Sequence, residues 1–255
     1  MKKIIIFRCA GGCFLGLLVT LLCLTSWESL SLAAEHTQAD VVWAKSDGLR
    51  YELFSSSLKN GNWSQPEQVT NDNADNLHPC IDMGPDGRKW LAWTAMEQGS
   101  YEIRYAVFKN GQWSDPKKLP SDLKSNISPS LVVDDRNVTW MVWAGNDGVH
   151  NDDIYFSRFI HGKWQKPARV NQANNVPDIL PRIELMAPHG YQVIWQGFRK
   201  NGYVKLVSRW TGHGWGPEHI YRNDDSATKA KNRNRQEIKP PKFVPQTRQM
   251  FLRTY

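Results

Sequence analysis

Short runs of apolar and polar residues alternate along the middle of this 255-residue chain. The runs "EIRYAVF" (102–108) and "DIYFSRF" (153–159) have the period of two that a half-buried strand requires, and "KWLAW" (89–93) is a short aromatic run. Between the runs lie turn-forming stretches such as "GPDG" and "KNGQ". No stretch of useful length has the period of an amphipathic helix. The pattern predicts an all-β protein built of short strands.

Three series of residues share one period of 50 to 52 residues, and such a fixed period is the signature of repeat architectures. The series are Trp43, Trp93, Trp143 and Trp195; Trp63, Trp113, Trp164 and Trp215; and Pro79, Pro129 and Pro181. One period predicts four strands, at Pro79–Met83, Lys89–Trp93, Glu102–Phe108 and Trp113–Leu119. Four-stranded units of this length are typical of propeller blades, whose tryptophans would be buried between neighbouring blades.

A family resemblance supports this interpretation. The segments "YEIRYAVFKNGQWSDPKKL" (101–119) and "SNISPSLVVDDRNVTWMVW" (125–143) resemble the repeats of sialidase-type, BNR-like β-propellers. The resemblance covers Val41 to Tyr221 and implies a β-propeller of about four four-stranded blades. The chain departs from the family at the Asp-box, because "SSSLKNGNW" (55–63) lacks the spaced Ser, Asp and Gly before the tryptophan. We therefore expect three regions: a signal peptide at 1–34, the propeller repeats at 35–221 and a basic tail at 222–255.

The first 34 residues have the features of a secretory signal. A basic start precedes the apolar run Phe14–Leu24, and "SLA" (31–33) offers small residues at a cleavage site. This predicts a secreted or periplasmic protein, with a membrane anchor left uncleaved as the alternative. Three of the four cysteines lie in this segment, so Cys80 alone remains afterwards and no internal disulfide can form. We expect Cys80 to be a buried, inert thiol.

The first repeat lacks an innermost strand, because that strand would fall inside the signal. The tail contains two strand-like pieces, 242–244 and 249–255, and we expect one of them to pair with the first repeat and close the ring. The alternative is an open half-ring that pairs with a second copy as a homodimer.

The tail carries nine Lys/Arg against three Asp/Glu, whereas residues 35–221 carry 20 against 21. The basic tail is thus either a solvated segment or a contact for an anionic surface. Nucleic acid is not expected as a partner of an exported protein.

The longer loops of the repeats all emerge on one face, which is where we expect a ligand. The candidate ligand-binding residues on these loops are Asn76, Glu97, Asn126, Asp147, His150, Asp178 and Arg199. Asn76, Asn126 and Asp178 recur before the proline of each repeat, which favours a structural role in capping turns. The other four do not recur and are the better candidates for chemistry. No cofactor or metal is predicted, since "NDGVHNDD" (146–153) lacks the spacing of a calcium loop.

These features favour a non-catalytic module that binds carbohydrate or a protein partner. One alternative is a sialidase-like glycoside hydrolase or lyase. The resemblance implies that such an enzyme binds the substrate carboxylate with several arginines. The arginines that we place on the loop-rich face are Arg50, Arg182 and Arg199. Glycoside hydrolysis also needs two carboxyl groups beside the bond. The other alternative is a structural platform that is tethered by the basic tail.

Overall fold

The computed structural model describes residues 38–187, 189–222, 238–245 and 250–255. These residues form strands and turns, and no helix lies among them, which confirms the all-β class. Accordingly, this part of the chain holds no helix that could cross a membrane. The expected signal peptide and much of the basic tail, residues 223–237 and 246–249, lie outside the described residues.

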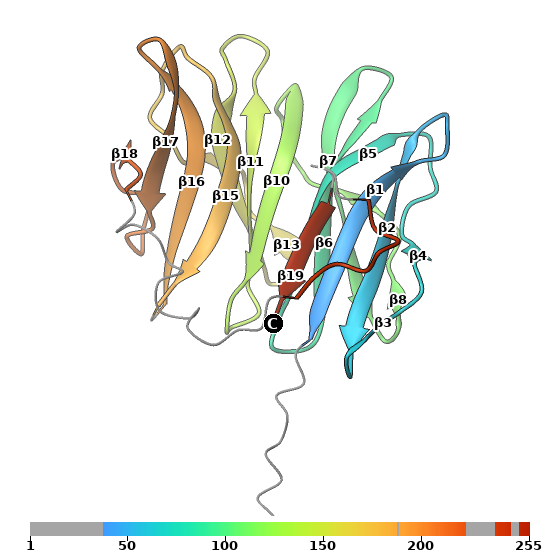
Figure 1. Cartoon of the computed structure of the whole chain (residues 1–255). Coiled ribbons are helices and arrows are strands. Elements are labelled where there is room, and N and C mark those ends of the chain that lie inside the picture. The colour runs from blue at the N-terminus through green and yellow to red at the C-terminus, as the bar shows by residue number, and fades with distance from the viewer. Residues whose placement is uncertain (1–37, 188, 223–237, 246–249) are drawn as a thin grey trace, which may run out of the picture. The chain divides into compact units, whose positions relative to one another are not determined.

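The strands follow the sequence repeat closely, and we number the repeats 1 to 4 (Figure 1). Repeat 1 contains β1 (Ala39–Ser46), β2 (Tyr51–Lys59), β3 (Asn62–Trp63) and β4 (Glu67–Gln68). Repeat 2 contains β5 (Asp75–Met83), β6 (Lys89–Glu97), β7 (Ser100–Lys109), β8 (Gln112–Trp113) and β9 (Lys117–Lys118). Repeat 3 contains β10 (Ser125–Val133), β11 (Thr139–Asn146), β12 (Asp153–Ile160), β13 (Lys163–Trp164) and β14 (Ala168–Arg169). Repeat 4 contains β15 (Asp178–Met186), β16 (Gly190–Arg199), β17 (Gly202–Arg209) and β18 (His219–Ile220).

Each repeat is an antiparallel meander whose outermost strand differs from the prediction. The strand expected at Trp113–Leu119 is split into β8 and β9, which both pair with β7. Pro116 lies between the two pieces and has no N–H to donate to a sheet. The inner strands are longer than expected and contain a bulge, as between Leu77 and Cys80. The bulge places His78 at a positive φ of 51°.

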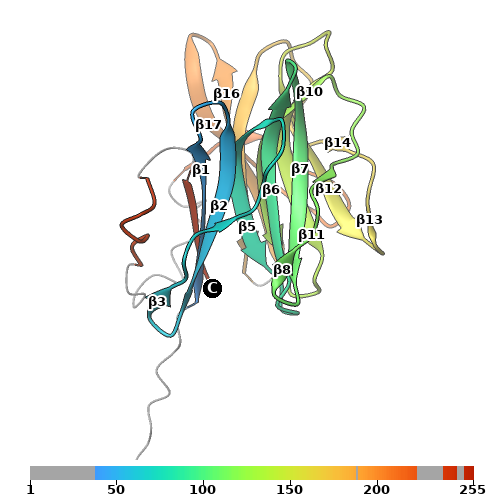
Figure 2. The same cartoon turned by 90° about the vertical axis from the view of Figure 1, so that its right-hand side faces the viewer.

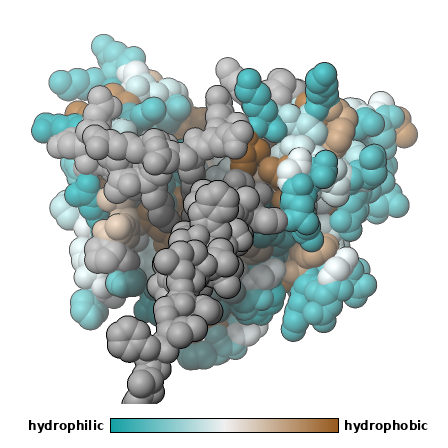
Figure 3. Space-filling view, turned by 60° about the horizontal axis from the view of Figure 1, so that its bottom comes forward, coloured by the Kyte–Doolittle hydropathy of each residue, from teal (hydrophilic) through white to brown (hydrophobic). Residues whose placement is uncertain are grey.

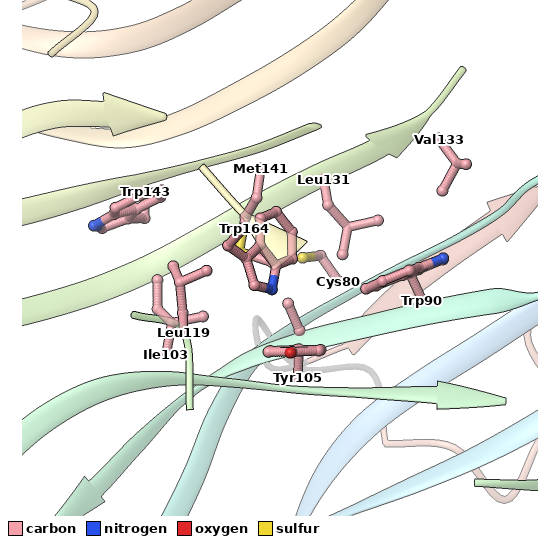
Figure 4. Close-up of a cluster of buried hydrophobic side chains, with 11 residues drawn as sticks. Cys80, Trp90, Ile103, Tyr105, Leu119, Leu131, Val133, Met141, Trp143 and Trp164 are labelled. Carbon is pink, nitrogen blue, oxygen red and sulfur yellow. The ribbon is translucent and has the colours of Figure 1, made fainter. Parts of the chain in front are cut away.

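Neighbouring repeats pack face to face, as the two views of Figures 1 and 2 show. Strand pairing between repeats 2 and 3 is limited to one parallel bridge, Ser125 with Tyr101, so side-chain packing and a few side-chain hydrogen bonds hold them together. Figure 4 shows this packing, in which Cys80 and Tyr105 of repeat 2 lie beside Met141 and Trp164 of repeat 3. Burial raises the pKa of the Cys80 thiol to about 12, in keeping with an inert cysteine.

The C-terminal segment lies against the first repeat, where the sequence analysis expected it. Strand β19 (Met250–Thr254) pairs antiparallel with β1, with Trp43 opposite Met250. Phe251 packs against the apolar clusters around repeat 2, and Arg253 binds Asp82 of β5 through two nitrogens. Residues 243–244 cover the outward face of repeat 1, where the Phe243 ring lies 6.0 Å from that of Trp43.

The expected closed ring is not confirmed. The strands fall into three hydrogen-bonded sheets, and within the described ranges no strand of repeat 4 pairs with β1 or β19. Repeat 4 packs against repeat 3 on one face only, through Val193 and Trp195. Among the described residues, no apolar cluster joins its other face to another repeat.

Candidate functional site

The recurring polar residues on the inner strands hold the buried tryptophans in place. The indole Nε1 of Trp93 donates a hydrogen bond to Asn76 Oδ1 at 2.6 Å, and Trp143 Nε1 donates to Asn126 Oδ1 at 2.8 Å. All three acceptors are buried, including Asp178, whose Oδ1 accepts from Trp195 Nε1 at 2.9 Å. Only Asn76 and Asn126 also donate to a nearby turn carbonyl, as expected of a cap. Their recurrence is explained by the need for an acceptor opposite each indole.

Three of the candidates that the sequence analysis treated as non-recurring do recur. Glu97, Asp147 and Arg199 each follow the strand tryptophan by four residues, at the position that Asp47 has in repeat 1. The recurrence is hidden in the sequence because the residue type changes from acidic to basic in repeat 4. The structural interpretation given to Asn76 and its equivalents therefore applies here too.

Asp147 and His150 are in contact, and together they shape one exposed loop. Asp147 Oδ1 accepts hydrogen bonds from the backbone N–H groups of Val149 and His150, and its Oδ2 lies 2.8 Å from His150 Nδ1. The side-chain hydrogen bond with His150, followed by the backbone bonds, holds the pKa of Asp147 well below its usual range. Asp47 makes the same two backbone contacts in repeat 1, to Leu49 and Arg50, so the loop geometry repeats.

Glu97 belongs to an ion-pair network centred on Arg104. The Arg104 guanidinium lies 2.9 Å from Glu97 Oε2, 2.9 Å from Asp72 Oδ2 and 2.7 Å from Glu102 Oε1. Burial raises the pKa of Glu102, but hydrogen bonds from Lys118 and Arg104 outweigh it and leave that pKa lowered. The network joins the loop before β5 to the β6–β7 hairpin, which is a structural role.

Arg199 compensates a charge that is particular to repeat 4. Repeat 4 has the carboxylate of Asp178 where repeats 2 and 3 have asparagine, and Arg199 Nη1 lies 3.2 Å from its Oδ1. Arg199 Nη2 binds Glu218 at 2.7 Å. Asn171 Nδ2 links Asp178 to Asp153, whose pKa is raised mainly by burial. These carboxylates are enclosed by their partners.

The candidates do not converge on one pocket of the described chain. Of the seven, Asp147 contacts His150 and Arg199 contacts Asp178, and every charged member already has a partner within the protein. Ligand binding by these residues stays a prediction.

At the end opposite the long loops, the described residues of the tight turns are mostly hydrophilic (Figure 3). A cavity of about 350 Å³ there is bordered by Asp86 and Arg88, which bind each other, and by Phe108, Lys109 and Asn110.

A different cavity lies on the outward face of repeat 4. It has a volume of about 170 Å³ and is lined by residues of β15, β16 and β17 and the residue after β18. The lining residues are Leu180, Arg182, Ile194, Trp195, Gln196, Lys205 and Tyr221. Neither an aspartate nor a glutamate is among them.

This face is polar because repeat 4 replaces the apolar residues that the other repeats bury. Gln196 takes the position of Ala144, and Lys205, opposite Gln196 on β17, takes that of Ile154. Ala144 and Ile154 are fully buried between repeats 3 and 4. Since side chains on one face alternate along a strand, Gln196 and Lys205 point away from the core of repeat 4.

Several polar groups around the cavity are unengaged. Among the described residues, no hydrogen bond or ion pair involves the side chains of Gln196, Lys205 or Tyr221. Arg182 binds Glu184 through one nitrogen, which leaves its other donors open. Ile194 provides an apolar floor, as it is only 9% exposed. Sequence reasoning missed this face because it expected the ligand on the loops; the substitution of Gln and Lys for Ala and Ile was the available signal.

No protein-family description matches the chain, and no curated protein matches it. Among solved structures, a protein of unknown function from Dyadobacter fermentans DSM 18053 has a TM-score of 0.59 at 11% identity, covering 72% of this chain and 69% of that one. This likeness shows a shared fold and nothing more.

Two carbohydrate-active enzymes are less similar. A xylan β-1,4-xylosidase from Bacillus halodurans C-125 has a TM-score of 0.49 at 16% identity, covering 72% of this chain and 40% of the enzyme. A GH43 endo-arabinanase from Bacillus licheniformis has a TM-score of 0.47 at 18% identity, covering 69% and 73%. Both TM-scores lie below 0.5.

Proposed function

We propose that this chain is a secreted or periplasmic, non-catalytic carbohydrate-binding module. Its four repeats would be the blades of an open, BNR-like β-propeller, and the ligand would lie on the outward face of repeat 4. The observation that carries the proposal is the cavity on that face. It combines an apolar floor and an aromatic ring with polar side chains that have no partner in the described part of the protein.

The chemistry of the cavity suits a sugar. A pyranose ring offers hydroxyl groups at its rim and C–H groups on its faces. Tyr221 and Ile194 provide apolar surface, while the Gln196 amide and the Tyr221 hydroxyl can each donate and accept hydrogen bonds. A small number of polar groups in a mostly apolar hollow is the usual composition of a small-ligand site.

The absence of lining carboxylates favours binding over hydrolysis. A glycosidase needs two carboxyl groups on either side of the scissile bond. The neighbouring acid on this face is Glu184, which is held by Arg182 and by a 2.8 Å hydrogen bond from Gln192 Nε2. Glu97, Asp147 and Asp178 of the loop face are likewise held by arginine, histidine or asparagine.

A glycan array with the full chain tests the proposal, with Tyr221→Ala and Gln196→Ala as variants. Losing the aromatic contact, about 1 kcal/mol, should weaken binding by about fivefold. Tyr101→Ala is a matched control, because Tyr101 is also part-exposed, at 39%, and lies on repeat 2. Equal binding by all three variants, or turnover of fluorogenic glycosides by the wild type, would refute the proposal.

Export is part of the same proposal and rests on the sequence of residues 1–34. Cell fractionation should find the chain outside the cytoplasm, and N-terminal sequencing should find it shortened near residue 34. A full-length chain in the cytoplasmic fraction would contradict it. The failure of this experiment would leave sugar binding untouched.

A further inference from the structure

The outward face of repeat 4 carries more positive than negative charge. The alternation along β17 places Lys205 and Arg209 on the same face, and Arg182 of β15 lies on it as well. The acid identified on this face, Glu184, is bound to Arg182. Lys205 is exposed and forms no ion pair within the described chain.

The charge is spread across the sheet rather than concentrated at one point. Arg182 and Lys205 lie on strands separated by β16, so their backbones are two strand spacings, about 10 Å, apart. Lys205 and Arg209 are four residues apart on one strand, which corresponds to about 13 Å. A ligand with charges repeated along its length can meet cations that are spread across the sheet in this way.

The amide group of the cavity lies between Arg182 and Lys205, and the aromatic ring lies on the far side of Lys205. Gln196 is on the middle strand β16, directly opposite Lys205, and Tyr221 borders the same hollow from the β18 side. A ligand that spans the face from β15 to β18 therefore meets a cation, then the hydroxyl-binding amide of Gln196, then a second cation and the ring of Tyr221. This order matches a sugar polymer whose residues carry carboxylates.

We propose that the ligand of this face is an acidic polysaccharide, bound along its chain through carboxylates on successive residues. The inference rests on the proposed carbohydrate-binding function and narrows it to one class of glycan. Lys205 supplies the cation that is not already paired, and Arg182 supplies the second through its open donors. A point charge such as an ammonium attracts carboxylates without fixing their geometry, which suits a repetitive ligand.

Titration calorimetry with oligogalacturonate and its fully methyl-esterified form tests the proposal, since both share one backbone and differ in charge. The full chain should bind the acid form more tightly, and free galacturonic acid should bind weakly. Lys205→Met should weaken binding of the acid form by about fivefold, which corresponds to one exposed charge pair, and leave the ester form unchanged. Lys117→Met, an exposed lysine of β9, is the matched control and should bind like the wild type.

Each other outcome counts against the inference. Equal binding of the acid and ester forms would show a sugar site that ignores charge, which overturns the acidic class but leaves the proposed function standing. Equal losses in Lys205→Met and Lys117→Met would show unspecific attraction to a basic protein and overturn the site. If neither form binds, the inference is wrong, and the proposed function is then decided by the neutral glycans of the array.

Discussion

Replacing Arg253 tests whether the C-terminal strand β19 is held against β5. Arg253 lies on β19 and binds the Asp82 carboxylate of β5 at 2.9 and 3.1 Å, across 171 residues of chain. The Asp82 side chain is 3% exposed, and its Oδ2 also accepts a hydrogen bond from the Val133 N–H of β10 at 3.0 Å. Asp82 thus joins three inner strands. Replacing Arg253 with methionine keeps much of the side-chain volume and removes the charge.

The expected loss follows from leaving a buried carboxylate without its cation. Breaking a fully buried pair costs about 3–5 kcal/mol. Arg253 is 35% exposed and the Val133 hydrogen bond remains, so we expect Arg253→Met to lower the free energy of unfolding by about 2 kcal/mol at pH 7. Truncating a single exposed ion pair would cost less than about 1 kcal/mol.

The loss of unfolding free energy in Arg253→Met should depend on pH, and the pKa of Asp82 determines the direction of this dependence. Burial raises this pKa above its ordinary value, and Arg253 acts in the opposite direction. Without Arg253 the folded-state pKa rises further, so the folded variant binds a proton that the unfolded chain releases, and stability falls as pH rises through this window. Below the unfolded pKa of about 3.9 both states are protonated and the charge penalty vanishes.

Urea denaturation followed by tryptophan fluorescence at pH 7 and pH 4 measures both quantities. The difference between wild type and Arg253→Met should shrink at pH 4, and the double variant Asp82→Asn with Arg253→Met should show no such dependence. A loss below about 0.5 kcal/mol at pH 7, or an equal loss at both pH values, would mean that β19 is not seated against β5 as described.

Three further predictions concern the interior and the tail. Asn126→Leu should lower the free energy of unfolding by about 2 kcal/mol, because the Trp143 indole loses its acceptor, whereas Asn62→Leu at an exposed turn should change it little in the same urea titration. Cys80 should resist a thiol reagent in the native protein and react stoichiometrically in denaturant; rapid native labelling would contradict its burial and its pKa of about 12. Deletion of residues 238–255 should shift tryptophan emission to the red, since it uncovers Trp43, and an unchanged spectrum would show that the segment does not cover this face.

The repeat architecture could be predicted from the sequence because its determinants are local and periodic. The strand tryptophans, such as Trp93 and Trp143, sit at fixed intervals within alternating runs, and each packs against the preceding repeat as expected. The place of the C-terminal strand could also be predicted, since the missing inner strand of repeat 1 leaves an edge that few segments can fill. Whether the repeats close into a ring could not be predicted, because closure depends on how the first and last faces match.

The site was harder to predict than the fold. Polar side chains on loops suggest ligand contacts, but Glu97 and Asp147 form ion pairs and turn bonds that depend on which residues the fold brings near them. Arg199 illustrates the same limit, since its partner Asp178 is 21 residues away and the pair makes sense only beside the buried Trp195 indole. Spacing reveals which positions are equivalent, while the role of a charged residue depends on its three-dimensional neighbours.

The two end faces of the repeat array differ in a way that bears on function. The outward face of repeat 1 is apolar, and Val244 of the C-terminal segment covers Trp43 there. The outward face of repeat 4 places Gln196 and Lys205 where the inner repeats bury apolar residues. Arrays of repeats need polar terminal faces to stay soluble, so a few polar substitutions on the last repeat would meet that need alone. A cap of this kind does not require a hollow with an aromatic ring, unengaged amide and hydroxyl groups and an unpaired cation around it. The combination at repeat 4 therefore goes beyond what solubility requires, and it is why we propose that the ligand binds to this face and not to the loops.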